Sequence, residues 1–551
     1  MENDIEIKEE KPRFSLDKKK ICKIASIVLP LLLILLSFAV VVYYILGPAE
    51  GYFHSDCTDT LLWAQASYDS GKLISDNFKY AALLPFGGNL LMLPFIPIFG
   101  VSMTTHNIGM VLFAVLFFLS LYALARSLGY NLAKTSFIIF AVTMVLSGSD
   151  KLREIMWGHI IYYSLGLLFL AFGLYLVNKT PCDRLLFADK THRAKDIVLM
   201  AGLFVFSALT ATNGIQSVVT YILPVVGALM LERIFAEKEE KPLMRTRWNN
   251  MLTLVAVFLA STIAGLLLLK LLSGDVQAGY ANAYSCYSGM NTWKDNLLKF
   301  GEWLSLIGVS VKDGDDLVSI ESIGNLIRIF TGIFILILPI IGACLYKKIE
   351  SRGAKLVLLA HFVQSALILF GYIFGWRLTP MLGTAVLASA VTACELIKPQ
   401  GFALVSKRFA VLSLCLLCLS PIVSVRQIAK MPADYGRDND LHRVAEKLEE
   451  LDLKYGYAEF WKSQAITVLS DSKVKVRNIQ IVNGTIKKYE YQSEYTWFDD
   501  QPDISEYFIL LSDYEFSLLE EYIDYEFPFT KVYNIDGYKV VVLNYNLFGK
   551  E

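Results

Sequence analysis

Two aspartates, Asp56 and Asp59, stand three positions apart in the segment HSDCTDT, directly after the first long apolar run of the chain. If this segment is helical, both carboxylates lie on one face, and Leu62, Trp63 and Ala66 lie towards the membrane. One interpretation is structural, with Asp56 as the N-cap of a helix and Asp59 in its first turn. The other is chemical, because a carboxylate at this place can remove a proton from a hydroxyl group. The pair alone leaves both interpretations open.

A second group of ionisable residues lies in SGSDKLREIMWGHIIYY, at the start of another apolar run. It contains Asp150, Arg153, Glu154 and His159. The end of a lipid-facing helix has little use for so many ionisable groups, and such groups at membrane depth mark candidate functional sites. The segment therefore predicts a second acidic site, Asp150 and Glu154, beside two residues that can carry positive charge.

A third candidate is Arg377, in the short connection FGWRLTPML between two apolar runs. Its structural interpretation is an arginine that extends its charged end to the membrane interface. Its functional interpretation is an anion ligand, since a guanidinium group binds the oxygens of a phosphate in pairs. Carboxylates and cations on the same side would suit transfer of a group from a lipid phosphate carrier.

A long loop at 273–323 is rich in aromatic residues, among them Tyr280, Tyr284 and Trp293. Aromatic side chains at the edge of a membrane are commonly interface anchors. The same residue types would also serve as a lid over a sugar or lipid substrate, because flat rings cover the apolar faces of both. Both interpretations stay open.

These residues must be positioned by a membrane protein. The chain has 551 residues, of which 55% are hydrophobic, and a mean hydropathy of +0.47, which is too apolar for a soluble domain. The run at 22–46 exceeds the roughly 20 residues that cross a bilayer and has no small-residue cleavage site after it, so we expect a retained helix. Eleven membrane-spanning helices are expected, near residues 22–46, 104–126, 133–148, 158–177, 197–213, 215–235, 251–272, 324–346, 355–375, 379–397 and 409–428.

The connections between these runs alternate in charge, and those rich in Lys and Arg fall on one side. By the positive-inside rule that side is the cytoplasm. Residues 1–20 are then a cytoplasmic tail, and residues 21–430 form the membrane body with outer loops at 47–103 and 273–323. Residues 431–551 form a domain outside the membrane.

The last 121 residues have the pattern of a small α/β domain. A stretch at 439–456 has apolar residues at helical spacing, and short runs such as KVRNIQIV and KVVVLNYN follow, separated by turn signals in VNGT and NIDGY. This part contains 13 Lys and Arg against 23 Asp and Glu, which predicts no nucleic-acid surface. The aromatic residues of YGYAEFW are interpreted as the core of this domain. Cys57 and Cys286, both in predicted outer loops, either pair or remain free thiols.

This arrangement resembles the GT-C superfamily of membrane glycosyltransferases, which use polyprenyl-phosphate sugars as donors. It is most similar to the group of protein O-mannosyltransferases and aminoarabinose transferases, which carry a catalytic acidic residue in the first outer loop, where HSDCTDT stands. The resemblance implies a catalytic role for Asp56 or Asp59, with Asp56 favoured as the base. A second acidic residue in the next outer loop would be Asp150 or Glu154. The donor phosphate would be bound by the basic residues Arg377, Arg153 and His159. No cofactor is firmly implied, and a divalent metal is left open.

The expected function is transfer of a sugar from a polyprenyl-phosphate carrier to a cell-envelope glycan, lipid or protein, with inversion at the sugar. The expected location is the cell membrane, with many passes, the N-terminus in the cytoplasm and the C-terminal domain outside. The main alternative is a transporter or flippase of lipid-linked envelope precursors, which would carry ionisable residues in the middle of its spans. Mid-span polar residues are few, and Gln216, His361 and Gln364 are the clearest. A non-catalytic envelope scaffold is a third alternative.

Overall fold

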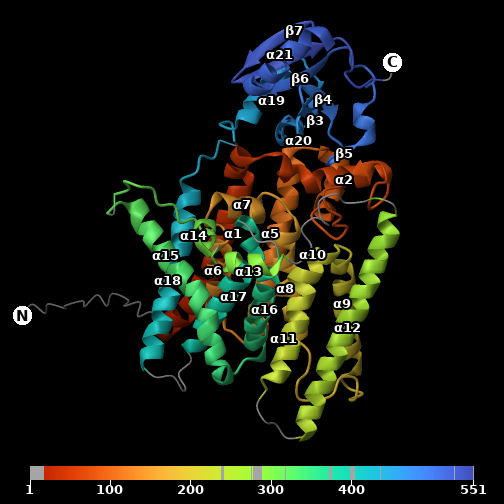
Figure 1. Cartoon of the computed structure of the whole chain (residues 1–551). Helices are drawn as coiled ribbons and strands as arrows, with labels where there is room; N and C mark the ends of the chain where they lie inside the picture. Colours follow the sequence, from red (N-terminus) through yellow and green to blue (C-terminus); the bar gives the residue numbers. More distant parts are fainter. Residues whose placement is uncertain are drawn as a thin grey trace, which may run out of the picture.

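The apolar runs form a bundle of long helices (Figure 1). The computed structural model describes residues 18–549 apart from 237–240, 275, 277–287, 299, 317, 372–374, 398–403, 435 and 527. Within these residues nine helices are long and apolar enough to cross a membrane. They are α1 (Lys18–Leu46), α5 (Met103–Ser127), α9 (Arg193–Ala211), the continuous α10 (Ile215–Ser217), η4 (Val218–Ile222) and α11 (Leu223–Ile234), α12 (Lys241–Ser273), α15 (Ile320–Cys344), α16 (Arg352–Leu369), η6 (Gly375–Leu378) with α17 (Thr379–Leu396), and α18 (Leu404–Ala429).

Two further apolar runs form shorter helices. α6 (Leu132–Val145) and α7 (Asp150–Trp157) pass the same test only as a pair, which is bent by 114°. α8 (Tyr162–Asn178) is 17 residues long and apolar. The prediction of a polytopic helical membrane protein with a small α/β domain is confirmed. All eleven predicted runs form helices, but α6 and α8 are each too short to count as a membrane span alone.

Small residues let the helices in the middle of the bundle approach closely. α17 is buried along its whole length and is rich in Ala, Gly, Ser and Thr. On α8, a Cβ atom at Gly173 would stand 2.0 Å from the ring of Tyr221, and one at Gly166 would stand 2.6 Å from the hydroxyl of Thr220. Because lipid gives helices no hydrophobic reason to associate, such close packing is a main source of their cohesion.

Two of the predicted mid-span polar residues, His361 and Gln364, make packing contacts. His361 Nδ1 lies 3.0 Å from the hydroxyl of Thr384 on the neighbouring α17. The side-chain amide of Gln364, oriented to satisfy both of its polar atoms, donates to the backbone carbonyls of Val219 and Thr220. Both side chains therefore connect neighbouring helices, as buried polar groups in a membrane must find partners within the protein.

The segment between α1 and α5 lies along one end of the bundle as a series of short elements. They are η1 (Pro48–Tyr52), η2 (Ser55–Thr58), α2 (Asp59–Ser70), β1 (Phe78–Lys79), α3 (Asn89–Met92), η3 (Leu93–Phe95) and α4 (Ile96–Phe99). The apolar part of this segment is broken because Pro94 and Pro97 cannot continue a regular helix. The expectation that Leu62, Trp63 and Ala66 lie towards the membrane is wrong. Trp63 binds the C-terminal domain, and the other two line a hollow between α2 and that domain.

The predicted loop at 273–323 contains two short helices, α13 (Met290–Leu298) and α14 (Phe300–Leu306). Tyr280, Tyr284 and Cys286 lie outside the described residues. Trp293 donates its indole N–H to the carbonyl of Ser288 at 3.1 Å and packs against Phe370 at the end of α16, with ring centroids 4.7 Å apart.

The C-terminal domain is a six-stranded sheet with helices. Its strand order is β4-β3-β2-β6-β8-β7, in which β2 is parallel to β3 and to β6 and the outer pairs are antiparallel. The elements are α19 (Asp440–Glu450), β2 (Tyr455–Glu459), α20 (Phe460–Leu469), β3 (Lys475–Val482), β4 (Thr485–Lys488), β5 (Ser493–Glu494), η7 (Tyr495–Phe498), β6 (Tyr507–Ser512), α21 (Asp513–Glu526), β7 (Lys531–Ile535) and β8 (Tyr538–Leu543).

Two hairpins of this sheet turn at the predicted turn signals. Asn483 and Gly484 have φ of 52° and 73°, and Asp536 and Gly537 have φ of 41° and 83°. Positive φ at both central residues is the geometry of the tight hairpin turn that Asn-Gly and Asp-Gly favour. The two predicted turn signals thus lie at the turns of the β3–β4 and β7–β8 hairpins.

The C-terminal domain is docked on the segment that follows α1 (Figure 1). β5 pairs antiparallel with β1, and the oxygen of the Gln492 amide accepts from the Trp63 indole at 2.9 Å and from the Ala81 N–H at 3.2 Å. Asn439, which caps α19, donates to the backbone carbonyls of Glu50 and Phe53, each at 3.1 Å. These bonds fix the domain above one end of the helical body.

Candidate active site

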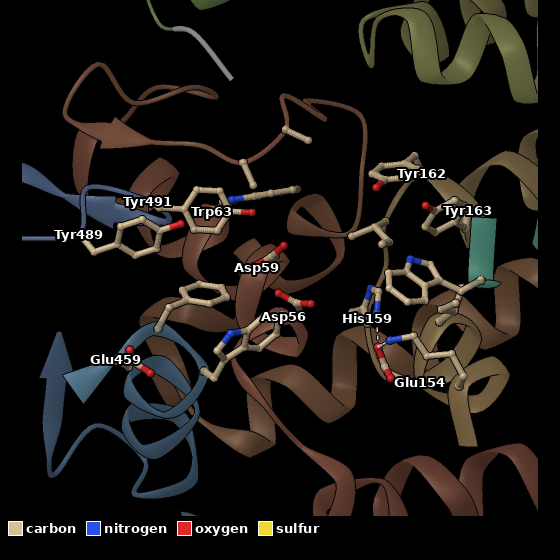
Figure 2. Close-up of a pocket in the computed structure, with 18 of the residues that line it drawn as sticks. Asp56, Asp59, Trp63, Glu154, His159, Tyr162, Tyr163, Glu459, Tyr489 and Tyr491 are labelled. Atoms are coloured by element: carbon tan, nitrogen blue, oxygen red, sulfur yellow. Dashed lines mark hydrogen bonds and ion pairs between the residues drawn. The ribbon is translucent and has the colours of Figure 1, made fainter. Parts of the chain in front are cut away.

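A large cavity lies where the helical body, the segment after α1 and the C-terminal domain meet. It has a volume of about 610 Å³, within the range of pockets that bind small molecules. Figure 2 shows two carboxylates near its centre, with residues of α7 and α8 on one side and of the C-terminal domain on the other. The side chains that line it include Asp56, Asp59, Trp63, Lys151, Glu154, His159, Tyr162, Tyr163, Trp376, Glu459, Phe460, Trp461, Gln480, Tyr489 and Tyr491.

Asp56 and Asp59 both line this cavity. Asp56 lies in η2, a single tight turn, and α2 begins at Asp59. The N-cap of α2 is Thr58, and no side chain makes a capping bond there. The expected N-cap role of Asp56 is therefore absent in the structure, and its carboxylate faces the cavity (Figure 2).

The environment of Asp59 disfavours its charged form. Burial and then the nearby carboxylate of Asp56 raise the pKa of Asp59 well above its usual value, while the Gln492 amide and His54 act in the opposite direction. Two adjacent carboxylates at a partly buried site cannot both ionise at little cost. The pair therefore favours a single negative charge, with Asp59 as the neutral member.

Opposite the aspartates, Glu154 of α7 is surrounded by groups that can carry positive charge. Its Oε1 lies 2.5 Å from Lys151 Nζ, 3.5 Å from His54 Nε2 and 3.6 Å from His159 Nε2. The N-terminus of α7 is formed by Ser149, whose hydroxyl accepts from the N–H of Leu152 at 3.1 Å. Because α7 turns away from α6 at this point, it brings Lys151 and Glu154 to the cavity.

Lys151 is a cavity residue that the sequence did not single out. Besides Glu154, its ammonium group lies 4.6 Å from the centre of the Trp376 ring, which also lines the cavity. A carboxylate and an aromatic face both attract a cation, and the Lys151 side chain stays 37% exposed. The signal was present in SGSDKLREIMW, since Lys151 and Glu154 are three apart and share a helix face.

Arg153 and Asp150 face elsewhere. Arg153 donates to the carbonyl of Ser147 at 2.9 Å, pairs with Asp150, and stacks over the ring of Tyr44 on α1. Neither Arg153 nor Asp150 lines the cavity. The two predicted acidic residues of this segment are thus separated, with Glu154 at the cavity and Asp150 at an exposed helix start.

Arg377 lies next to the cavity and is not among its lining residues. It belongs to the short turn η6, where the neighbouring Trp376 does line the cavity. Asp56 and this turn therefore lie at the same end of the helical body. Of the predicted aromatic lid, Trp293 packs on α16 and does not line the cavity.

The C-terminal domain supplies an aromatic wall. Tyr455 and Tyr457 are buried in its core, as expected for YGYAEFW, but Trp461 is 59% exposed and faces the cavity. Phe460 packs against Tyr491 and Tyr489, with ring centroids 5.1 and 6.2 Å apart. The sequence pattern could not separate core rings from wall rings because that depends on where the domain docks.

Two polar residues of the same domain stand among these rings. Glu459 and Gln480 line the cavity. A side-chain hydrogen bond with Glu515, together with partial burial, raises the pKa of Glu459. Lys462 holds Glu515 at 2.5 Å. Rings next to groups that donate and accept hydrogen bonds can bind a ligand with both apolar and hydroxyl-bearing faces.

The geometry does not identify a metal centre. Among the residues that the structure describes, no three His, Cys, Asp or Glu side chains stand together so as to hold a metal ion. Asp56 and Asp59 could supply two ligands, but among the described residues no third His, Cys, Asp or Glu side chain stands with them to complete a metal site.

Known proteins resemble this chain in its fold and not in its sequence. No protein-family model matches the chain, and no curated protein matches its sequence. The crystal structure of ArnT from Cupriavidus metallidurans bound to undecaprenyl phosphate superposes with a TM-score of 0.53 at 10% identity, over 97% of this chain and 99% of that one. The apo structure of the same protein gives a TM-score of 0.51 at 11% identity, over 97% and 100% of the two chains.

The chain has the fold of ArnT. The predicted fold class is thus confirmed, and the likeness extends over essentially the whole of both chains. At this identity the likeness concerns the arrangement of elements, and activity must be argued from the site itself.

Proposed function

We propose that the protein is a glycosyltransferase that moves a sugar from a polyprenyl-phosphate carrier to a cell-envelope acceptor on the outer face of the membrane. The observation that carries the proposal is a single cavity that joins the carboxylates of Asp56 and Asp59 to the cationic group around Glu154. It is supported by the shared fold with ArnT, whose structure has been solved with undecaprenyl phosphate bound.

In the proposed reaction Asp56 is the general base. Its carboxylate accepts the proton of an acceptor hydroxyl as that oxygen forms a bond to the anomeric carbon, and the bond from this carbon to the phosphate oxygen breaks. A single displacement inverts the anomeric configuration. Asp59 stays protonated, since burial and the charge of Asp56 raise its pKa, and it can donate a hydrogen bond to an acceptor or sugar oxygen.

The leaving group is a polyprenyl phosphate, which gains negative charge as the bond breaks. Lys151 and His159 are the proposed ligands of this phosphate because both line the cavity and lie beside Glu154 of α7. Preorganised cations aimed at developing charge are among the largest contributions to catalysis. Arg377 remains a proposed second ligand, since it follows Trp376 in the turn at the cavity. Arg153 is proposed to position α7 through Asp150 and Ser147.

The outer location of the site is supported by charge. A hollow lined by Arg247, Lys347, Arg352 and Lys355, among others, lies at the opposite end of the bundle from the cavity. Basic residues concentrate on the cytoplasmic side of membrane proteins. The cavity and the C-terminal domain would then be outside, and a lipid-linked sugar would enter from the outer leaflet.

Among glycan, lipid and protein acceptors, we favour a glycan. The wall from the C-terminal domain combines exposed Trp461 with Tyr489, and places Glu459 and Gln480 beside them. An aromatic face can cover the apolar side of a sugar ring while carboxyl and amide groups bind its hydroxyls. Transport of lipid-linked precursors is less well supported, because His361 and Gln364 make packing contacts in the middle of the bundle.

The test is complementation in cells that lack the protein. The missing glycan and the accumulated polyprenyl-phosphate sugar would be quantified by mass spectrometry after re-expression of the wild type, of Asp56→Asn or of Asp76→Asn. Asp76 is an exposed aspartate of the same outer segment that pairs with Lys72 and does not line the cavity. We expect the wild type and Asp76→Asn to restore the glycan and Asp56→Asn to leave the carrier sugar accumulated. Full restoration by Asp56→Asn would rule out this residue as the base.

A further inference from the structure

A second polar cavity lies at the end of the helical bundle opposite the candidate active site. It has a volume of about 310 Å³ and is bordered by the end of α11, the start of α12, the turn η5 (Tyr346–Lys348) and the start of α16. Five cationic side chains line it against two carboxylates, Glu232 and Glu350. The cations are Arg233, Arg247, Lys347, Arg352 and Lys355.

The inner part of this cavity is built around the buried side chains of Glu232 and Arg233. Arg233 Nη2 and Arg352 Nε both approach the same carboxylate oxygen of Glu232, at 3.2 and 3.1 Å. Arg352 also donates to the hydroxyl of Thr180 at 3.3 Å, in the connection after α8. Guanidinium groups held by a shared carboxylate in this way keep a fixed direction.

The outer part of the cavity is amphiphilic. Lys355 Nζ stands 5.0 Å from the centre of the Tyr346 ring, and Phe235 meets the same ring edge to face, with centroids 6.1 Å apart. Phe235, Ile234 and Met230 are exposed at the end of α11, directly beside the cationic lining. Exposed apolar side chains next to a cationic pocket at a helix end match a ligand with an anionic head and an apolar tail.

We propose that this cavity binds the head group of an anionic phospholipid, with the phosphate among Arg247, Lys347 and Lys355 and an acyl chain along the end of α11. Basic pockets between membrane helices on the cytoplasmic side are suited to anionic lipid head groups. A lipid bound here would contact α11, α12 and α16 together, at the end of the bundle opposite the candidate active site. The site is independent of the proposed transferase activity.

The experiment titrates the purified full-length protein in detergent with three probes: dioleoyl phosphatidylglycerol, dioleoyl phosphatidylcholine and inorganic phosphate. The melting temperature is followed, and bound lipid is counted by native mass spectrometry. We expect phosphatidylglycerol to raise the melting temperature in a saturable way, with one molecule retained at the site. Neither phosphatidylcholine nor inorganic phosphate should do so. Equal stabilisation by phosphatidylcholine, or by inorganic phosphate alone, would overturn the proposal.

The variant Lys347→Gln/Lys355→Gln locates the effect. We expect it to raise the apparent dissociation constant for phosphatidylglycerol by on the order of tenfold or more, since each cation near the surface adds to the attraction. Lys348→Gln is the matched control, because Lys348 is exposed, adjacent and not part of the lining. If the double variant is poorly folded, Lys347→Gln alone replaces it, since that side chain is exposed. An unchanged constant in the variants, or an equal loss in Lys348→Gln, contradicts the site.

Discussion

At the scale of single residues, the surroundings of Asp59 favour its protonated form. Burial raises the pKa of Asp59, and the carboxylate of Asp56 raises it further. A carboxyl group whose pKa is higher in the folded than in the unfolded protein stabilises the fold below the unfolded pKa. That contribution is lost as pH rises through the folded pKa.

This gives a prediction on stability. Replacing Asp59 by Asn removes the cost of ionising a buried group while nearly keeping its shape. The melting temperature of Asp59→Asn should therefore match that of the wild type below the unfolded pKa of an aspartate, about 3.9, and exceed it increasingly as pH rises from there towards neutrality. Thermal unfolding of the purified proteins across this range measures it. A constant difference between the two proteins at all pH values would show that Asp59 does not titrate as inferred.

Lys151 carries the second residue-level prediction. Lys151→Gln should lower sugar transfer by about a hundredfold, because it removes one preorganised cation from the developing phosphate charge. It should also weaken binding of undecaprenyl phosphate. Lys151→Arg should recover part of both, and Lys72→Gln, a change in an exposed ion pair of the segment between α1 and α5, should alter neither. Retained activity in Lys151→Gln would show that Lys151 does not bind the phosphate and would favour Arg377 as its ligand.

At the scale of elements, the C-terminal domain and α2 are held together by Gln492. In Gln492→Ala the indole N–H of Trp63 and the N–H of Ala81 lose their acceptor in a buried place. An unpaired buried polar group costs about 1–3 kcal/mol. We therefore expect the variant to expose the domain to limited proteolysis at lower temperature than the wild type. Gln501→Ala, whose side-chain bonds stay within the C-terminal domain, is the control and should behave like the wild type.

Packing of α8 against η4 gives a further prediction. Gly173→Ala places a methyl group 2.0 Å from the Tyr221 ring, and overpacking a core of this kind costs about 1–3 kcal/mol. Gly202→Ala is a matched change in the membrane helix α9, with no atom within 4 Å of its added methyl. We expect a lower melting temperature and yield for Gly173→Ala alone. Equal behaviour of the two variants would indicate that α8 and η4 are less closely packed than they are in the structure.

The predictable part of the fold follows from local physics. Long apolar runs must be helical in lipid because backbone groups find no water there, and Asn-Gly and Asp-Gly turns mark two hairpins. Docking of the C-terminal domain is not local. Whether Trp63 faces lipid or Gln492, and whether Trp461 lies in a core or in a wall, depends on a contact between segments about 400 positions apart.

The candidate site, too, was predictable from the sequence only in part. Asp56 and Asp59 were recognisable because two carboxylates follow a membrane run at helical spacing. Lys151 and Arg153 are both basic and two positions apart, and only the register of α7 decides that Lys151 reaches the cavity while Arg153 turns to Tyr44. Charge type is visible in a sequence, whereas its direction depends on the packing around it.

At the scale of the whole molecule, the protein places a cavity between a membrane bundle and a docked domain. Its fold is that of ArnT, and cations gather at the opposite end of the bundle. This arrangement would let a carrier lipid stay in the bilayer while its sugar meets an acceptor held by the domain. Transfer and transport then differ in what happens to the bond between sugar and phosphate.

The most direct measurement follows that bond. The purified full-length protein in liposomes would be given polyprenyl-phosphate sugars and envelope glycan extracted from the cells that lack it. Free polyprenyl phosphate would then be counted by mass spectrometry, and the configuration of the new linkage determined by NMR. We predict one polyprenyl phosphate released per sugar moved, inversion at the anomeric carbon, and a loss of at least about a hundredfold in Asp56→Asn with carrier binding retained. Movement of intact carrier sugar across the bilayer without its cleavage, or full transfer by Asp56→Asn, would contradict the account.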